Sequence, residues 1–246
     1  MRSLLVTGLL LVSGQSLPPH DATTVLARAR DAVGGVDALA RVESLHIAAI
    51  NNITPGDGSP LSGYGWGDWL GPGIGTNRQV THAWLAPPSR FLQRTDTIQS
   101  GFDGDRAIGT AVSNNDWWIR SSLWRWALPL LLYDPAALGL TVYGEWDAIL
   151  GNKATNVVEV GGPGDFDMRL YFDSRSNRLL MTQFTIGDRS ERDSYSEYKR
   201  VRGVGFSIEL PFRIRRDIEG SRNLTTIEWN VVQYQVNPKD LDRQFK

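Results

Sequence analysis

The chain has 246 residues, no cysteine and a formal net charge of -1, and 41% of its residues are hydrophobic. This length suits a single all-β domain, and the absence of cysteine excludes disulfides, thiolate metal sites and cysteine nucleophiles. Because the charge is near zero and no long run of Lys or Arg occurs, we expect no nucleic-acid partner.

The first residues have the pattern of a secretion signal. Arg2 supplies a positive charge, Leu4 to Val12 form a short apolar run, and Gly14 and Ser16 are small residues suited to a signal peptidase. An apolar run of roughly nine residues is too short for the ~20 that a membrane-spanning helix needs. The sequence therefore predicts a signal peptide over 1–16, cleavage after Ser16, and a soluble periplasmic protein. With no cysteine to carry a lipid, we expect no lipoprotein anchor.

The mature chain, residues 17–246, begins with helical patterns. Asp21 is a candidate helix cap, Gly34 and Gly35 form a stop signal, and apolar residues recur between them at helical spacing. A second short helix is predicted over 36–42. These features indicate an N-terminal helical segment ahead of the strands.

Strand patterns follow, with a glycine-rich segment between them. From Leu45 the apolar residues alternate with more polar ones, which indicates a half-buried strand, and further strands are predicted over 77–86 and 90–97. The segment 102–106 is typical of a turn between strands. Residues 55–75 contain eight glycines, whose backbone freedom argues against a regular element. We expect a mobile loop insertion at this point.

One apolar helix is predicted among the strands, over residues 121–134 (SSLWRWALPLLLYD). Two serines are candidate caps, and Pro129 is expected to kink or divide the helix. We expect this segment to be a covering helix, because an apolar helix set into a run of strands must pack over a sheet.

Alternating patterns fill the remainder of the chain and predict an antiparallel sheet. The connections at 173–177 and 202–205 are short enough for hairpins, so successive strands should be neighbours. The fold class predicted is mainly β with α: one incomplete antiparallel β-barrel with an N-terminal helix and a covering helix. The strands expected after the covering helix are 153–160, 167–172, 179–186, 193–201, 210–218 and 224–234.

The sequence carries no recognisable catalytic motif. HExxH, HxH and the G-x-S-x-G elbow are absent, and His46 and His82 stand singly on predicted strands. The glycine runs of 55–75 lack the lysine and third-glycine spacing of nucleotide-binding loops. We therefore expect no enzyme, no metal site and no cofactor, and a hydrolase with an unrecognised site ranks last.

Aromatic residues form the most distinctive pattern. Two explanations remain open: ordinary core packing, because each buried indole removes ~150 to 250 Å² from water, and the lining or lid of a cavity for an apolar ligand. The candidate ligand-binding residues are Trp66, Trp69, Trp117, Trp118, Trp124, Trp126 and Tyr133.

The order of these segments resembles a known superfamily. The turn FDGDRA, the run DMRLYFDSRSNRLLMTQF, the strand pair around YKRVRGVGFSIELP and the closing segment VNPKDLDRQF look like the periplasmic lipoprotein carriers of the Lol type. The resemblance implies an incomplete barrel that binds acyl chains in a hydrophobic cavity. The Gly/Trp-rich insertion at 55–75 and the Trp-rich helix depart from the simplest carriers, which puts lipoprotein cargo itself in doubt.

Two functional hypotheses follow. The first is a monomeric periplasmic carrier or binding protein for a lipid-like or acylated ligand. The second is a non-catalytic envelope interaction module that uses exposed tryptophans, above all Trp66 and Trp69, to bind an envelope protein partner.

Overall fold

The computed structural model describes residues 21–54, 78–96, 98–109, 117–162, 166–186, 189–219 and 224–246. The predicted signal peptide over 1–16 and the predicted insertion over 55–75 lie outside these residues. Within the described ranges, no helix is both long enough and apolar enough to cross a membrane.

Two helices open the described chain, as the sequence predicts. Helix α1 (Ala22–Ala32) is capped by Asp21, whose Oδ1 accepts a hydrogen bond from the Thr23 amide at 3.2 Å. The chain then passes through Gly34 at a φ of 131°, a conformation that suits glycine, into α2 (Val36–Leu39). Helix α1 buries Val25, Leu26 and Ala29 in the main core, and α2 buries Ala38 and Leu39 there but leaves Val36 exposed.

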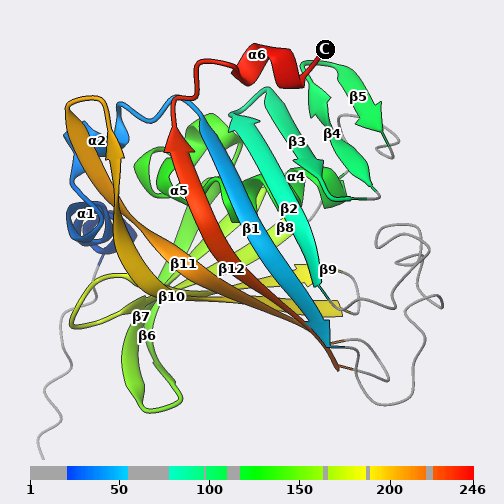
Figure 1. Cartoon of the computed structure of the whole chain (residues 1–246). Helices are drawn as coiled ribbons and strands as arrows, with labels where there is room; N and C mark the ends of the chain where they lie inside the picture. Colours follow the sequence, from blue (N-terminus) through cyan, green and yellow to red (C-terminus); the bar gives the residue numbers. More distant parts are fainter. Residues whose placement is uncertain are drawn as a thin grey trace, which may run out of the picture.

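The described strands form a single antiparallel sheet of twelve strands in the order β5-β4-β3-β2-β1-β12-β11-β10-β9-β8-β7-β6. Two meanders make up this sheet, and the pairing of β1 with β12 joins them. The sheet curves into a half-barrel whose free edges are β5 and β6 (Figure 1). The strands are β1 (Leu45–Thr54), β2 (Arg78–Ala86), β3 (Arg90–Arg94), β4 (Gln99–Asp103), β5 (Arg106–Gly109), β6 (Thr141–Leu150), β7 (Lys153–Gly162), β8 (Phe166–Asp173), β9 (Leu179–Ile186), β10 (Arg189–Gly203), β11 (Phe206–Glu219) and β12 (Leu224–Val236).

The concave face of the half-barrel carries the main hydrophobic core. Along β1, the side chains of Leu45, Ile47 and Ala49 are buried, and the residues between them are partly exposed. Strand β8 alternates in the same way from Phe166 to Phe172. Because both meanders turn their apolar side chains to one face, a single core forms inside the curve.

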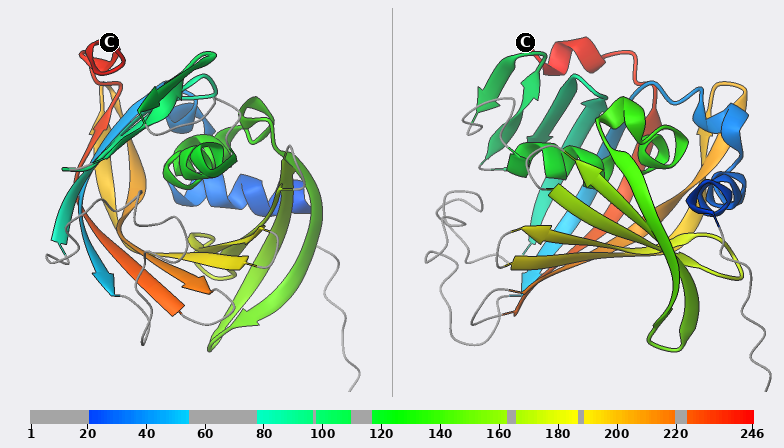
Figure 2. Two further views of the ribbon diagram at one scale, coloured as in Figure 1. Left: turned by 90° about the vertical axis from the view of Figure 1, so that its right-hand side faces the viewer. Right: turned by 180° about the vertical axis from the view of Figure 1, so that it is seen from behind.

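A helical segment connects the two meanders and lies in the hollow of the sheet (Figure 2). It consists of α4 (Trp117–Trp126), α5 (Leu128–Tyr133) and the short 3-10 helix η2 (Ala136–Leu138). The predicted helix over 121–134 is confirmed, although α4 begins earlier. The predicted division is also present, because Pro129 stands in the first turn of α5, where its missing N–H is not needed.

Strand β6 is a long element that the sequence pattern does not predict, and the short η2 and α6 (Leu241–Gln244) are not predicted either. The alternation along β6 is weak, because β6 is an edge strand that pairs only with β7 within the described sheet. Tyr143, Trp146 and Ile149 are 56%, 36% and 79% exposed. Apolar residues on such a strand do not separate into a buried and an exposed face, so periodicity does not reveal it.

The C-terminal segment packs on the outer face of the sheet. Helix α6 (Leu241–Gln244) leads to Phe245, which is buried with Trp84 and Leu92 in a second, smaller cluster. The guanidinium carbon of Arg90 lies 4.2 Å from the centre of the Phe245 ring, and Arg90 Nη1 lies 2.6 Å from Asp242 Oδ1. The closing segment is thereby attached to β2 and β3.

Two histidines are linked on the same outer face. His46 Nδ1 lies 2.9 Å from Gln235 Oε1, and His46 Nε2 lies 3.1 Å from His82 Nδ1. Because an amide oxygen only accepts, His46 donates from Nδ1 to Gln235, and His82 donates to His46 Nε2. Both imidazoles stack beside Trp84. The structure thus couples two residues that the sequence shows only singly.

The protein should become less stable as His82 takes up a proton. Burial, followed by the neighbouring His46 and Arg94, lowers the pKa of His82 below 6.5. The unfolded chain therefore binds more protons than the native protein below about pH 6.5, so the free energy of unfolding falls as the pH drops through this range. Urea unfolding at several pH values between about 5 and 7 gives the free energy of unfolding as a function of pH. This free energy should change less steeply with pH for His82→Gln than for the wild type. Equal slopes would contradict the assignment.

Candidate functional site

The described side chains of helix α4, over 122–126, are buried within the half-barrel. Every residue over 122–129 is buried, which is unusual for a helix that connects two parts of a sheet. In Figure 2 the helix runs through the hollow between the two walls of the curved sheet. The helix therefore fills the hollow of the half-barrel with its own side chains.

The structure brings two of the predicted ligand-binding tryptophans into the core. The ring of Trp124 packs 4.2 Å from Phe166, centre to centre, and its Nε1 donates to the carbonyl oxygen of Leu138 at 3.2 Å. Trp126 meets Trp229 of β12 edge to face, with ring centres 5.7 Å apart. The two indoles thus anchor α4 to opposite walls of the half-barrel.

The other predicted site residues are placed less fully. Tyr133 is partly buried and packs against the main core at the end of α5. Trp117 and Trp118 are the first residues of α4, and their side chains lie outside the described part of the chain, as do Trp66 and Trp69. A common cavity lined by all seven residues therefore stays a prediction.

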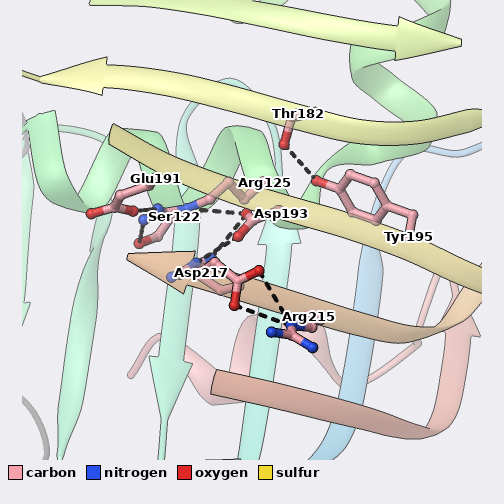
Figure 3. A network of polar contacts seen from close by, with 9 residues as sticks. Ser122, Arg125, Thr182, Glu191, Asp193, Tyr195, Arg215 and Asp217 are labelled. Carbon is pink, nitrogen blue, oxygen red and sulfur yellow. Dashed lines mark hydrogen bonds and ion pairs between the residues drawn. The ribbon is translucent and has the colours of Figure 1, made fainter. Parts of the chain in front are cut away.

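A buried charge cluster joins α4 to the sheet, and the sequence analysis missed it. Arg125 Nη1 of α4 lies 2.5 Å from Glu191 Oε2 of β10, and Arg125 Nε lies 3.9 Å from Asp193 Oδ2 (Figure 3). Asp193 in turn accepts two hydrogen bonds from Arg216 of β11, at 2.7 and 3.1 Å. The four side chains, Arg125, Glu191, Asp193 and Arg216, are here called the inner charge cluster.

The inner charge cluster is neutral overall and almost completely removed from water. Glu191 and Asp193 are 0% and 1% exposed, and the two guanidinium groups balance their charges. Burial lowers the pKa of Arg125. At Arg216 the same effect of burial is outweighed by Asp193, so the pKa of Arg216 is raised. Because an arginine side chain is not deprotonated in proteins, the two guanidinium groups balance the charges of Glu191 and Asp193.

Aromatic rings complete the surroundings of the two cations. The guanidinium carbon of Arg125 lies 5.3 Å from the centre of the Phe184 ring, and that of Arg216 lies 4.7 Å from the Trp229 ring. Trp229 also contacts Trp126. The charge cluster and the aromatic packing of α4 are therefore one connected structure, stabilised by cation–π contacts.

Some buried polar atoms on the concave face have no protein partner. Among the described residues, no hydrogen bond reaches Glu191 Oε1, Trp229 Nε1 or Ser100 Oγ. Ser100 lies on β4, beneath the region that α4 approaches. A buried polar atom without a partner costs free energy, so these positions are suited to a water molecule or a polar group of a ligand.

Polar residues gather at one end of the concave face. Asn51 and Thr81, which are hydrogen-bonded at 3.3 Å, lie on β1 and β2 on the same face as Ile47 and Ala49. Strands β1, β9 and β11 end at this side of the sheet, and β2, β4 and β10 begin here. Ser100 and the inner charge cluster lie close to these strand ends, so they share this end of the face with Asn51 and Thr81. The concave face is therefore polar at this end and apolar toward α1, α2 and α5.

One sequence feature could have revealed the cluster. Arg125 is the only charged residue in the apolar run SSLWRWALPLLLY, and a lone charge in such a helix requires a buried partner. Its partners could not be identified, because β10 has polar residues on both faces: Arg192 lies between the buried carboxylates Glu191 and Asp193, and Ser194 follows them. Only the strand register shows which carboxylates face inward.

Comparison with known proteins identifies the fold. No family model matches the chain, and no curated protein does either. The architecture is an open antiparallel half-barrel with an internal helix. A LolA superfamily protein from Nitrosomonas europaea matches it with a TM-score of 0.56 at 10% identity, over 92% of this chain and 97% of the other. The chain has the fold of the LolA superfamily.

Two further solved structures are similar. A DUF1329 family protein from Desulfovibrio piger has a TM-score of 0.52 at 8% identity, and the match covers 92% of this chain and 97% of the other. A domain from Vibrio parahaemolyticus, described as an outer membrane lipoprotein-sorting protein, has a TM-score of 0.48 at 8% identity, over 92% and 99%. At these identities the similarity establishes the fold alone.

Breaking the inner charge cluster should strongly destabilise the protein. Arg125→Met leaves Glu191 buried without its cation, so the free energy of unfolding should fall by about 3 to 5 kcal/mol in urea denaturation. The double variant Arg125→Met, Glu191→Met removes both charges and should lose less. Arg213→Met is the matched control, because Arg213 pairs with Glu228 at the exposed surface, and it should cost less than about 1 kcal/mol. Equal losses for Arg125→Met and Arg213→Met would contradict the account.

Proposed function

We propose that this protein is a non-catalytic periplasmic carrier that binds a lipid-like or acylated ligand on the concave face of its half-barrel. The observation that carries the proposal is the burial of α4 inside the curved sheet, where its apolar side chains take the place of a ligand. The similarity of its fold to that of a LolA superfamily protein supports the proposal.

Ligand binding then requires α4 to move. The side chains of Leu123, Trp124 and Trp126 cover apolar surface that would otherwise face water. An acyl chain that replaces them contributes about 0.8 kcal/mol for each buried methylene, so a chain of a dozen methylenes is enough to compete with a helix. In this exchange an acyl chain replaces the apolar side chains of α4, and the hydrogen bonds between the strands of the sheet stay intact.

The inner charge cluster gives this exchange a defined closed state. Arg125 connects α4 to β10, and its partners stay fixed on the sheet when the helix leaves. Asp193 keeps its two hydrogen bonds from Arg216 in either state, whereas Glu191 loses its cation. The cluster therefore favours the closed, ligand-free protein. A ligand must supply the free energy lost when Arg125 leaves Glu191, which weakly binding amphiphiles do not do.

The polarity of the concave face orients the ligand in this proposal. Acyl chains fit the apolar region near α1 and α5, and a polar head group fits the end that carries Asn51, Thr81 and Ser100. The unpartnered oxygen atoms of Glu191 and Ser100 offer hydrogen-bond acceptors there. An amphiphile is therefore a better ligand than a hydrocarbon without a head group.

The absence of cysteine allows a direct test of helix movement. Ser122 of α4 is 5% exposed, so the thiol of a Ser122→Cys variant should react slowly with a maleimide in the ligand-free protein. Addition of palmitic acid or a synthetic triacylated lipopeptide should accelerate labelling at least about tenfold, and native mass spectrometry should show the bound probe.

The matched control is Ser196→Cys, because Ser196 is exposed on β10 and should react quickly with or without the probe. Two results would contradict the proposal. One is that native mass spectrometry finds neither probe on the protein. The other is that a probe binds while the labelling rate of Ser122→Cys does not change, since this would place the ligand elsewhere.

A further inference from the structure

Two aromatic rings are held at the outer face of the edge strand β6, away from the concave site. Tyr143 is 56% exposed and Trp146 is 36% exposed. A β-bulge between Val142 and Gly144 makes Tyr143 the additional residue of its strand, so Tyr143 and Trp146 reach the same face although they are three residues apart. β6 is the outermost strand on this side of the sheet (Figure 2).

A glycine allows the Tyr143 ring to lie close to the sheet, and the Trp146 ring packs beside its own strand. A Cβ atom on Gly161 would stand 2.8 Å from Cε1 of Tyr143, so the tyrosine ring lies over the bare backbone of β7. Its hydroxyl donates to Asp167 of β8, which fixes the ring across two strands. The Trp146 ring lies near Gly144 of its own strand, where a Cβ atom would stand at the ordinary contact distance of 3.7 Å from Cζ3. Each ring is thus positioned before any partner arrives, which lowers the entropic cost of binding.

Charged groups lie between and beside the rings. Arg169 of β8 stands with its guanidinium carbon 5.5 Å from the centre of the Trp146 ring, and its Nε donates to Glu159 Oε1 at 3.1 Å. The hydroxyl of Tyr143 is held by Asp167 strongly enough to raise the pKa of Tyr143 to about 12. Tyr143, Trp146, Glu159, Asp167 and Arg169 are here called the outer platform.

The outer platform is rich in hydrogen-bond acceptors. Glu159 and Asp167 each use one carboxylate oxygen within the described chain, and the second oxygen is available to a ligand. The Tyr143 hydroxyl already donates to Asp167, so it cannot donate outward. A fitting partner must therefore offer several O–H or N–H donors together with a flat apolar face for the rings.

From this chemistry we propose that the outer platform binds a neutral saccharide. A pyranose ring presents C–H groups on one face, which pack on an aromatic ring, and hydroxyl groups at its rim, which donate to carboxylates. With two carboxylates and one guanidinium, the platform disfavours phosphorylated or sulfated glycans. A proline-rich peptide also packs on aromatic rings, but proline has no N–H and therefore cannot donate to the carboxylates of Glu159 and Asp167. The site is independent of the concave face and therefore of the proposed carrier function.

Titration calorimetry with neutral hexasaccharides tests this proposal. Chitohexaose or maltohexaose should bind the full protein with a Kd on the order of 0.1 to 1 mM. Trp146→Ala should raise the Kd at least about tenfold, because the main stacking surface is lost, and Glu159→Gln should raise it less. Ile149→Ala is the matched control, since Ile149 is 79% exposed on the same strand but three residues from Trp146 and on the other face.

Each outcome decides for or against the site. Binding that Trp146→Ala weakens and Ile149→Ala leaves unchanged supports the proposal. No heat of binding with either saccharide at about 10 mM overturns it, as does equal binding by the wild type and Trp146→Ala. Stronger binding of a proline decapeptide or of a sulfated oligosaccharide also overturns it. Should Trp146→Ala fail to fold by circular dichroism, Glu159→Gln and the wild-type titrations still decide.

Discussion

The ion pairs between Arg125 and the carboxylates of β10 are the interaction on which the functional account depends. They connect a helix to the strands that enclose it. Because both partners are buried, removal of one leaves the charge of the other without a partner in a low-dielectric interior. A hydrophobic contact alone would hold α4 without a fixed register. The charge cluster specifies one position of the helix on a face that is apolar toward α1, α2 and α5.

Much of the fold could be predicted from local patterns. The cap at Asp21, the stop at Gly34 and the alternation from Leu45 each reflect short-range physics, and the structure confirms α1 and β1 where these signals place them. The hairpins also follow from short connections. Strand β6 was missed because periodicity requires one buried face, and an edge strand with Tyr143 and Ile149 both exposed does not have one.

The candidate site was predicted only in its aromatic part. Trp124 and Trp126 could be singled out because their residue type is rare and their segment apolar, and both prove to be anchors of α4. The partnership of Arg125 with Glu191 joins residues 66 positions apart, and it depends on how two meanders close around a helix. No local pattern carries that information. The same holds for the outer platform, where a bulge at Tyr143 and the glycine at 161 decide how the tyrosine ring lies.

Hydrogen exchange of the α4 backbone measures the central claim most directly. The claim is that α4 is an exchangeable occupant of the half-barrel, whereas the strands form a permanent frame. With palmitic acid bound, amides over 122–127 should exchange faster, and those of β1 and β12 should keep their protection. Unchanged exchange over 122–127 in a protein shown to hold palmitic acid would contradict the account, because α4 would then be a permanent part of the core.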